Sequence, residues 1–285
     1  MEKKYSLLKF VKLLIAKMHH DHIMEYAYHL TYNLLLSFFP FLIFLTTLVS
    51  YANLDSAAIL SSLKAYLPQE VHTFISEIVI DVVDQQRDGL MSFSVLFAIY
   101  AASGGFRSFM EATNRALGVH ERRNIIFRFA LSILCVVLFA LAIVMALLGI
   151  VFGQQIINLV NRYGLIPLNE LLHVLRVIIP ELMVFLLILS FYIFVPAQRV
   201  CLRCALPGAV FTTFVWIIFT MIFQFYVNHF SHYSRFYGAL GTVIILLLWL
   251  LLTSVIMLTG VEINGLLMEL NIIKPLQSKV KNIGP

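Results

Sequence analysis

The sequence predicts an all-α fold: one polytopic membrane helix bundle over residues 1–285, with six transmembrane helices and additional amphipathic surface helices. Hydrophobic residues make up 61% of the chain and charged residues only 12%, so it could not stay soluble as one compact domain. Residues 239–261 contain no charged side chain, and about 20 such residues cross the hydrocarbon core as a helix. Their apolar pattern is continuous and not alternating, which favours a helix over a barrel strand.

The apolar stretches of the chain, taken in order, predict where the spans lie. The stretch that begins at residue 181 is short, and we expect it to borrow the helix that precedes it. The predicted spans are residues 31–51, 89–106, 127–152, 181–195, 204–228 and 238–262.

Three further segments carry apolar residues at helical spacing opposite a polar face. Residues 1–30 predict a basic amphipathic helix that lies on anionic lipid. Residues 71–83, which follow Pro68, and residues 171–179 predict two surface helices on the outer side of the membrane.

Helix breakers and polar side chains interrupt the first two predicted spans. Pro40 removes a backbone donor from the first span and predicts a kink there. Polar side chains within a span usually face other helices or a water-filled path, and not lipid. We therefore interpret this set as a candidate substrate path, with ordinary helix packing as the alternative. The set comprises Tyr32, Asn33, Ser37, Pro40, Tyr100 and Ser103.

The distribution of positive charge predicts the orientation of the bundle. Six spans place both termini on the same side of the membrane as segments 107–128 and 196–203. Fifteen of the 20 Lys and Arg residues fall on that side. The positive-inside rule therefore places both termini in the cytoplasm.

Charged side chains at the cytoplasmic ends of the second and last spans predict an ion pair between them. Glu262 closes the last span, and a carboxylate at the edge of lipid is costly unless it is paired. Arginine offers a bidentate partner, so we expect Glu262 to contact Arg107 or Arg115. Asn114 or Asn264 should lie nearby. The predicted cytoplasmic charge cluster is Arg107, Glu111, Asn114, Arg115, Glu262 and Asn264.

A His-dense stretch at residues 19–22, followed by Glu25 and His29, is the candidate metal site in the sequence. Zinc requires three or four converging ligands, and no distant Cys or His cluster completes such a set. We interpret the stretch as a polar juxtamembrane turn, and we expect no metal and no cofactor. The net charge of +5 serves membrane topology, so membrane lipids are the expected partners and nucleic acid is not.

Two groups of potential nucleophiles are interpreted without catalysis. Ser103 lies in residues 101–104, which faintly resemble a serine protease motif, but the predicted spans contain no His or Lys to act as its base. Cys201 and Cys204 form a lone CxxC pair on the cytoplasmic side, which we interpret as incidental. We therefore expect no catalytic residue and no enzymatic activity.

Three blocks of residues carry a resemblance to a known family. They are HLTYNLLLSFFPFLIFL at residues 29–45, NRALGV at residues 114–119, and the stretch from YGALG at residue 237 through LWL to GVEIN at residue 264. Together they resemble the YihY/BrkB family of bacterial inner-membrane proteins, in the right order over nearly the whole chain. Leu117 replaces an aromatic residue of the family pattern. The resemblance implies a multi-pass protein of the bacterial plasma membrane; some members are discussed as transporters of envelope lipid, and many carry an old ribonuclease label.

Two functional hypotheses follow from the residues and the resemblance. The first is a transporter or lipid-translocating protein of the bacterial envelope, and the second is a non-transporting envelope scaffold. A ribonuclease is not expected, because a metal-dependent nuclease needs clustered His and Asp ligands and the HHDH stretch lacks their alternation. The sequence leaves open whether the protein forms a homo-oligomer.

The predicted orientation can be tested by thiol labelling of intact cells. A cysteine introduced at Glu77 or Asp84 should react with an impermeant thiol reagent, because the loop that follows the first span lies outside. A cysteine at Lys279 should be protected, because it lies in the cytoplasm. Labelling at Lys279 with protection at Glu77 would reverse the orientation.

Overall fold

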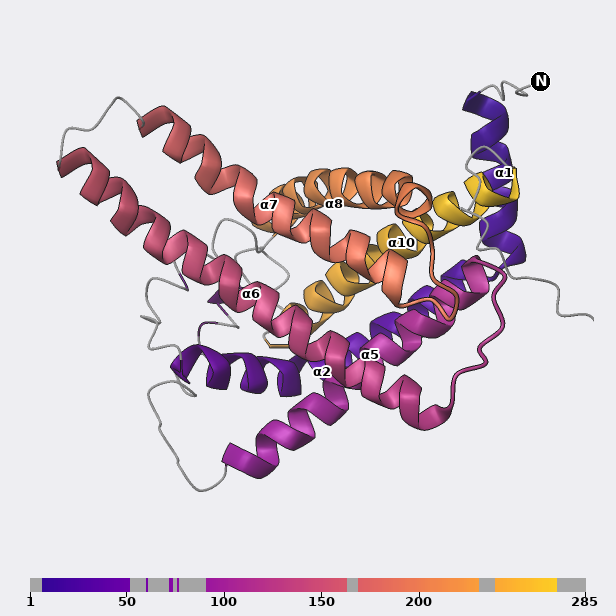
Figure 1. The fold of residues 1–285 in the computed structure, drawn as a ribbon, viewed down its shortest axis with the longest axis horizontal. Helices are drawn as coiled ribbons and strands as arrows, with labels where there is room; N and C mark the ends of the chain where they lie inside the picture. The colour runs from indigo at the N-terminus through magenta and orange to yellow at the C-terminus, as the bar shows by residue number, and fades with distance from the viewer. Residues whose placement is uncertain are drawn as a thin grey trace, which may run out of the picture.

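The computed structural model describes residues 7–51, 91–162, 169–230 and 239–270, together with residues 60, 72, 73 and 76. The regular structure in this part of the chain is entirely helical, which confirms the predicted all-α membrane bundle (Figure 1). The helices with described bounds are α1 (Leu7–His20), α2 (Ile23–Tyr51), α5 (Met91–Ala116), α6 (Ile125–Arg162), α7 (Asn169–Phe194), α8 (Leu202–Phe230) and α10 (Ala239–Glu269).

Three of these helices are long and apolar enough to cross a membrane. They contain the segments Ile125–Met145, Leu202–Val227 and Val243–Glu269, with mean hydropathies of 2.7, 2.0 and 2.6. Helix α7 adds a shorter apolar segment, Glu181–Phe194. The count of six spans stays a prediction.

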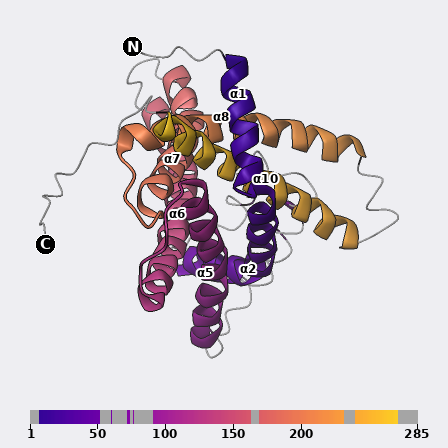
Figure 2. The ribbon, with the colours of Figure 1, turned by 90° about the vertical axis from the view of Figure 1, so that its right-hand side faces the viewer.

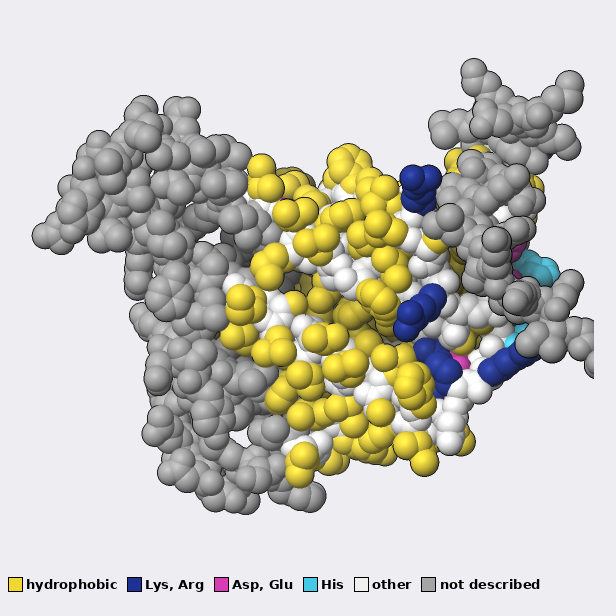
Figure 3. Space-filling model, viewed as in Figure 1, with side chains coloured by type: hydrophobic (Ala, Val, Ile, Leu, Met, Phe, Trp, Pro, Cys, Tyr) yellow, Lys and Arg dark blue, Asp and Glu magenta, His cyan; other side chains and the backbone are white. Residues whose placement is uncertain are grey.

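The surface of the molecule has the polarity of a membrane protein. Hydrophobic side chains cover the middle of the described surface, and the Lys and Arg side chains gather at one end (Figure 3). On α8, large apolar side chains such as Phe214 and Met221 are each 65% exposed. A soluble monomer rarely shows so extended an apolar surface, whereas lipid covers it in a membrane.

The predicted helix over residues 1–30 is wrong in its extent, because the chain breaks between α1 and α2. His22 has a φ of 55°, in the left-handed region that interrupts a helix. After the break, the side chains of Ile23, Ala27 and Leu30 are fully or almost fully buried. One side of residues 23–30 therefore joins the core, whereas α1 keeps the exposed apolar face of an interfacial helix, with Ile15 61% exposed.

Other boundaries differ from the prediction because helices continue past the apolar segments. Helix α5 extends ten residues beyond the predicted end of the second span, and α6 runs to Arg162. Helix α7 is continuous from Asn169 through Pro180, so the segment predicted as the fourth span shares one helix with the residues before it, and residues 171–179 are not a separate surface helix. Pro40 lies inside α2, which changes direction along its length (Figure 2). The predicted surface helix at residues 71–83 lies outside the described residues.

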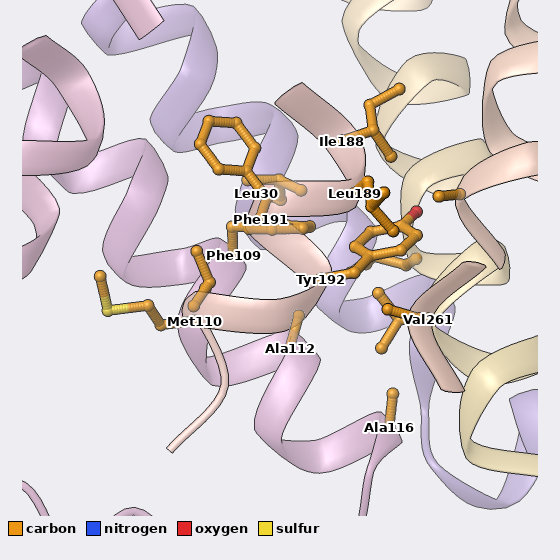
Figure 4. Packing of buried hydrophobic residues seen from close by; sticks show 14 of the residues in the cluster. Leu30, Phe109, Met110, Ala112, Ala116, Ile188, Leu189, Phe191, Tyr192 and Val261 are labelled. Atoms are coloured by element: carbon orange, nitrogen blue, oxygen red, sulfur yellow. The ribbon is translucent and has the colours of Figure 1, made fainter. Parts of the chain in front are cut away.

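Aromatic side chains from α5 and α7 form the centre of the core (Figure 4). Phe106 packs edge-on against Phe191 with ring centroids 5.2 Å apart, and Phe109 stacks against Tyr192 at 6.5 Å. The buried Tyr192 hydroxyl donates to the Met257 carbonyl oxygen at 2.6 Å, which connects α7 to α10. Helix α2 packs most extensively against α5, and α10 packs against α8 and α2.

Helices α8 and α10 approach each other closely at two glycines. A Cβ atom on Gly208 would overlap the Gly260 carbonyl oxygen, and one on Gly260 would overlap the Thr212 hydroxyl. The Asn264 side chain joins the same contact, because it accepts a hydrogen bond from Gly208 N at 2.7 Å and donates to the Ala205 carbonyl at 3.2 Å. Small residues and satisfied polar groups of this kind are the usual means of helix association in lipid.

Candidate functional site

A carboxylate buried in the apolar part of α10 is the most unusual polar group among the described residues. Glu262 has no exposed surface, and neither of its carboxylate oxygens accepts a hydrogen bond within the described part of the chain. Its neighbours on α10, Leu258 and Val261, are also buried. An ionisable group in such surroundings is expensive and therefore indicates a functional role.

The nearest cation to Glu262 is Lys17 of α1, whose Nζ lies 3.5 Å from Glu262 Oε2. The same ammonium group contacts Asp21 at 2.8 Å and Glu269 at 2.7 Å. We call these four residues, Lys17, Asp21, Glu262 and Glu269, the ionic cluster. One lysine is shared among three carboxylates, so its ion pair with Glu262 competes with its contacts to the other two.

Gly265 permits this approach of α1 to α10. A Cβ atom there would lie 2.7 Å from the Ala116 carbonyl oxygen of α5 and 3.3 Å from Lys17 Cε. A larger residue would push both neighbouring helices away from α10.

The environment of the ionic cluster keeps Lys17 and Asp21 charged. Burial opposes protonation of Lys17, but hydrogen bonds to Asp21 and Glu269 and the charge of Glu262 raise its pKa above the ordinary value. Burial also opposes ionisation of Asp21, but hydrogen bonds from Lys17 and His20 lower its pKa. Lys17 is therefore a cation and Asp21 an anion at neutral pH.

The predicted pairing of Glu262 with Arg107 or Arg115 is wrong, because Lys17 occupies that place. Arg107 donates to the Ser103 hydroxyl, and its guanidinium lies over the Phe129 ring at 5.3 Å. Arg115 is exposed. Lys17 follows Leu13 and Leu14 at helical spacing, and all three are half-buried in the structure, so this side of α1 is packed. The sequence alone assigned the lysines to the polar face.

The two predicted asparagines have other hydrogen-bond partners than the pair of Lys17 and Glu262. Asn264 binds α8 through Gly208 and Ala205. Asn114 donates to Glu121 Oε2 at 2.8 Å and accepts from Ala197 N at 2.7 Å. Asn114 thereby ties the end of α5 to the turn between α7 and α8.

Arg123 completes this tie by binding Glu121 through two nitrogens. Arg123 Nε donates to Glu121 Oε1 at 2.8 Å and Nη2 donates to Oε2 at 2.7 Å, while Nη2 also donates to the Val195 carbonyl at 3.1 Å. These hydrogen bonds lower the pKa of Glu121 to about 2.

The candidate substrate-path residues divide into two groups. Asn33 and Ser37 lie in the contact between α2 and α5, where Asn33 donates to the Ser108 hydroxyl at 2.7 Å and Ser37 to the Ala101 carbonyl at 2.8 Å. Ser103 is buried and donates within α5 to the Tyr100 carbonyl at 2.6 Å. Tyr32 and Tyr100 are 62% and 55% exposed and point away from that contact. The six predicted residues therefore do not converge on one site.

An open cavity of about 480 Å³ lies beside the ionic cluster and shares Asp21 with it. Its walls come from the turn between α1 and α2, the last turns of α5, the loop after α5 and the first turn of α6. They are formed by His20, Asp21, Tyr26, Glu111, Asn114, Arg115, Gly118, Val119, His120, Glu121 and Arg128. Of the predicted charge cluster, Glu111, Asn114 and Arg115 meet here.

The cysteines and histidines singled out in the sequence have simple structural roles. Cys201 and Cys204 are disulfide-bonded at the start of α8, which corrects their interpretation as an incidental pair. His22 hydrogen-bonds Glu25 at 2.9 Å in the turn before α2. Within the described ranges, no three His, Cys, Asp or Glu side chains are arranged to hold a metal ion.

Comparison with known proteins places this architecture among bacterial membrane proteins. Residues 14–279 match the model of the family described as virulence factor BrkB. The chain is 33% identical to the ribonuclease-like protein YfkH of Bacillus subtilis over 84% of this chain and 87% of that protein. It is 25% identical to the UPF0761 membrane protein of Pseudoalteromonas atlantica over 90% and 84%, and 25% identical to VP0125 of Vibrio parahaemolyticus, another UPF0761 membrane protein, over 93% and 83%. No solved structure matches the chain.

The contact between Glu121 and Arg123 predicts a pH dependence of stability. The pKa of Glu121 falls from 4.5 to about 2 on folding. The carboxylate therefore stabilises the fold fully above about pH 4.5, and this stabilisation is lost as the pH falls toward about 2. Glu121→Gln should lower the melting temperature in detergent at neutral pH. The difference in melting temperature between this variant and wild type should shrink as the pH falls from about 5 to about 3. The exposed Glu25→Gln is the matched control; a Glu121→Gln difference that is constant with pH would contradict the assignment.

Proposed function

This chain belongs to the BrkB family of membrane proteins, and we propose that it is a transporter or lipid-translocating protein of the bacterial plasma membrane. The single observation that carries the proposal is the buried, unsatisfied Glu262 carboxylate beside an open polar cavity. We further propose that both termini are cytoplasmic, so that the ionic cluster faces the cytoplasm. No part of this proposal requires catalysis, and without a nucleotide-binding motif transport is passive or ion-coupled.

The energetics of the ionic cluster favour a working site over a packing contact. Burying an ion pair costs several kcal/mol per ion, and a well-packed apolar pair of the same volume is often as stable. Elsewhere in the bundle, polar groups such as Asn264 and Tyr192 are fully engaged with backbone or hydroxyl partners. Glu262 departs from this pattern, because its hydrogen-bonding capacity is unused.

The attachment of α1 gives this site a means of opening. Helix α1 packs mainly against α10 and α2, and it is joined to α2 at His22, where the backbone is left-handed. If α1 tilts about this joint, Lys17 moves away from Glu262. Lys17 stays close to Asp21, because both residues precede His22 in the chain and move together. The carboxylate would then lose its cation and be available to a proton, an ion or a lipid headgroup.

The scaffold hypothesis remains the alternative, and Asn33 and Ser37 suit it, since their hydrogen bonds join α2 to α5. That role would leave the ionic cluster without a function. Lipid movement therefore separates the two hypotheses.

Proteoliposomes that contain the purified protein and a fluorescent phospholipid in both leaflets test the proposal. Dithionite bleaches only the outer leaflet, so bleaching beyond that of protein-free vesicles measures translocation. We expect wild type to translocate lipid and Glu262→Gln to change the rate about tenfold or more. Lys17→Met should change the rate as well, because it removes the cation beside Glu262. Lys12→Met is its matched control, because Lys12 is an exposed lysine of the same helix, α1, and its replacement should leave the rate unchanged. Wild-type vesicles that bleach like protein-free ones would overturn lipid translocation and favour the scaffold.

A further inference from the structure

We infer that the cavity at the charged end binds the headgroup of a zwitterionic phospholipid, with its phosphate on Arg115 and Arg128 and its amine at Glu111. This inference rests on the proposed function for its biological meaning, because it names the class of lipid that the protein would handle.

The cavity lies at the depth where a lipid headgroup meets its acyl chains. Arg128 lines the cavity, and the three residues before it, Ile125, Ile126 and Phe127, are 78%, 75% and 57% exposed at the start of α6. The apolar surface of the bundle ends at a band of Lys and Arg side chains (Figure 3). A lipid could therefore lay its chains along α6 while its headgroup enters the cavity.

Two acidic side chains of the cavity wall are already paired with cations of the protein. Asp21 is paired with Lys17 at 2.8 Å, and Glu121 is paired with Arg123 at 2.7 Å. Neither carboxylate therefore needs a ligand, and neither would repel a phosphate as strongly as a free carboxylate.

The charges that remain are of opposite sign and face the cavity together. Glu111 and Arg115 are exposed, and neither takes part in an ion pair within the described residues. Arg128 lies 3.8 Å from Glu121, but its buried Nε donates no hydrogen bond to any described residue. The cavity thus offers guanidinium donors for a phosphate and a separate carboxylate for an amine.

The placement of Glu111 and Arg115 matches a ligand with two charges. They are one helical turn apart on α5, about 6 Å along the axis. A free phosphate or an anionic headgroup would satisfy the arginines but place a negative charge near Glu111. A phosphate joined to an amine by two carbons satisfies both, and a cavity of about 480 Å³ lies in the usual range for a small ligand.

Calorimetric titration of the purified full-length protein with soluble headgroups tests this site. We expect glycerophosphoethanolamine to bind about tenfold more tightly than glycerophosphoglycerol or inorganic phosphate. Glu111→Gln should abolish this preference, and Arg115→Gln should weaken both glycerophosphodiesters about tenfold. Arg122 is an exposed arginine of the loop after α5 that does not line the cavity, so Arg122→Gln should change neither the preference nor the affinity. All three variants change exposed side chains, and unchanged melting temperatures would verify their folding.

Three outcomes overturn the inference. The first is equal binding of inorganic phosphate, which would make the cavity a simple anion site. The second is a preference for the ethanolamine headgroup that survives Glu111→Gln, and the third is the absence of binding.

Headgroup binding with the expected variant pattern, but without lipid movement in proteoliposomes, would support the site while overturning the transport function. Lipid movement without headgroup binding would overturn the site alone.

Discussion

Burial of one carboxylate sets the arrangement of the charged end of the bundle. An unpaired charge in an apolar interior costs several kcal/mol, so Glu262 requires a cation that the protein supplies. Lys17 supplies it from α1, 3.5 Å away. Helix α1 must therefore lie against α10, and the contact depends on Gly265, since a side chain there would meet Ala116 and Lys17.

Two other buried polar side chains of the bundle, Asn264 and Tyr192, are treated differently, and the contrast shows what is particular about Glu262. Between α8 and α10, glycines bring the backbones together and Asn264 satisfies the backbone of α8. The Tyr192 hydroxyl likewise binds Met257 and Thr212. These groups hold helices in register, as polar residues in membrane bundles usually do. Glu262 gives up its hydrogen bonds for a shared ion pair, which is a costly way to join two helices and a useful way to hold a releasable charge.

The sequence predicted the helices well and their contacts poorly, and the reasons differ. An apolar stretch such as that of α10 needs only length and composition to be recognised, because lipid leaves the backbone no alternative to a helix. The break at His22 was missed because the apolar spacing continues across it into residues that turn out to be core, such as Ile23. Local periodicity does not distinguish a face that meets lipid from one that meets protein.

The charge cluster shows the same limit at the level of single residues. Glu262 was identified as a carboxylate that needs a partner, because its position at the end of a span makes that need local. The partner was assigned to arginines of α5. In the structure Arg107 binds the Ser103 hydroxyl and lies over the Phe129 ring, and Lys17 of α1 is the cation that contacts Glu262. The sequence placed the lysines of residues 1–30 on the polar side of the helix, and only the tertiary fold shows that Lys17 meets α10.

A double-mutant cycle between Lys17 and Glu262 tests the central claim most directly. Lys17→Met leaves the buried carboxylate without its cation, and should reduce the free energy of unfolding by about 3–5 kcal/mol. Adding Glu262→Gln removes the charge that needed the lysine, so the double variant should recover most of that loss, measured by equilibrium unfolding in the same detergent. If the two losses simply add, the side chains are not coupled, and Lys17 is not the group that permits Glu262 to be buried.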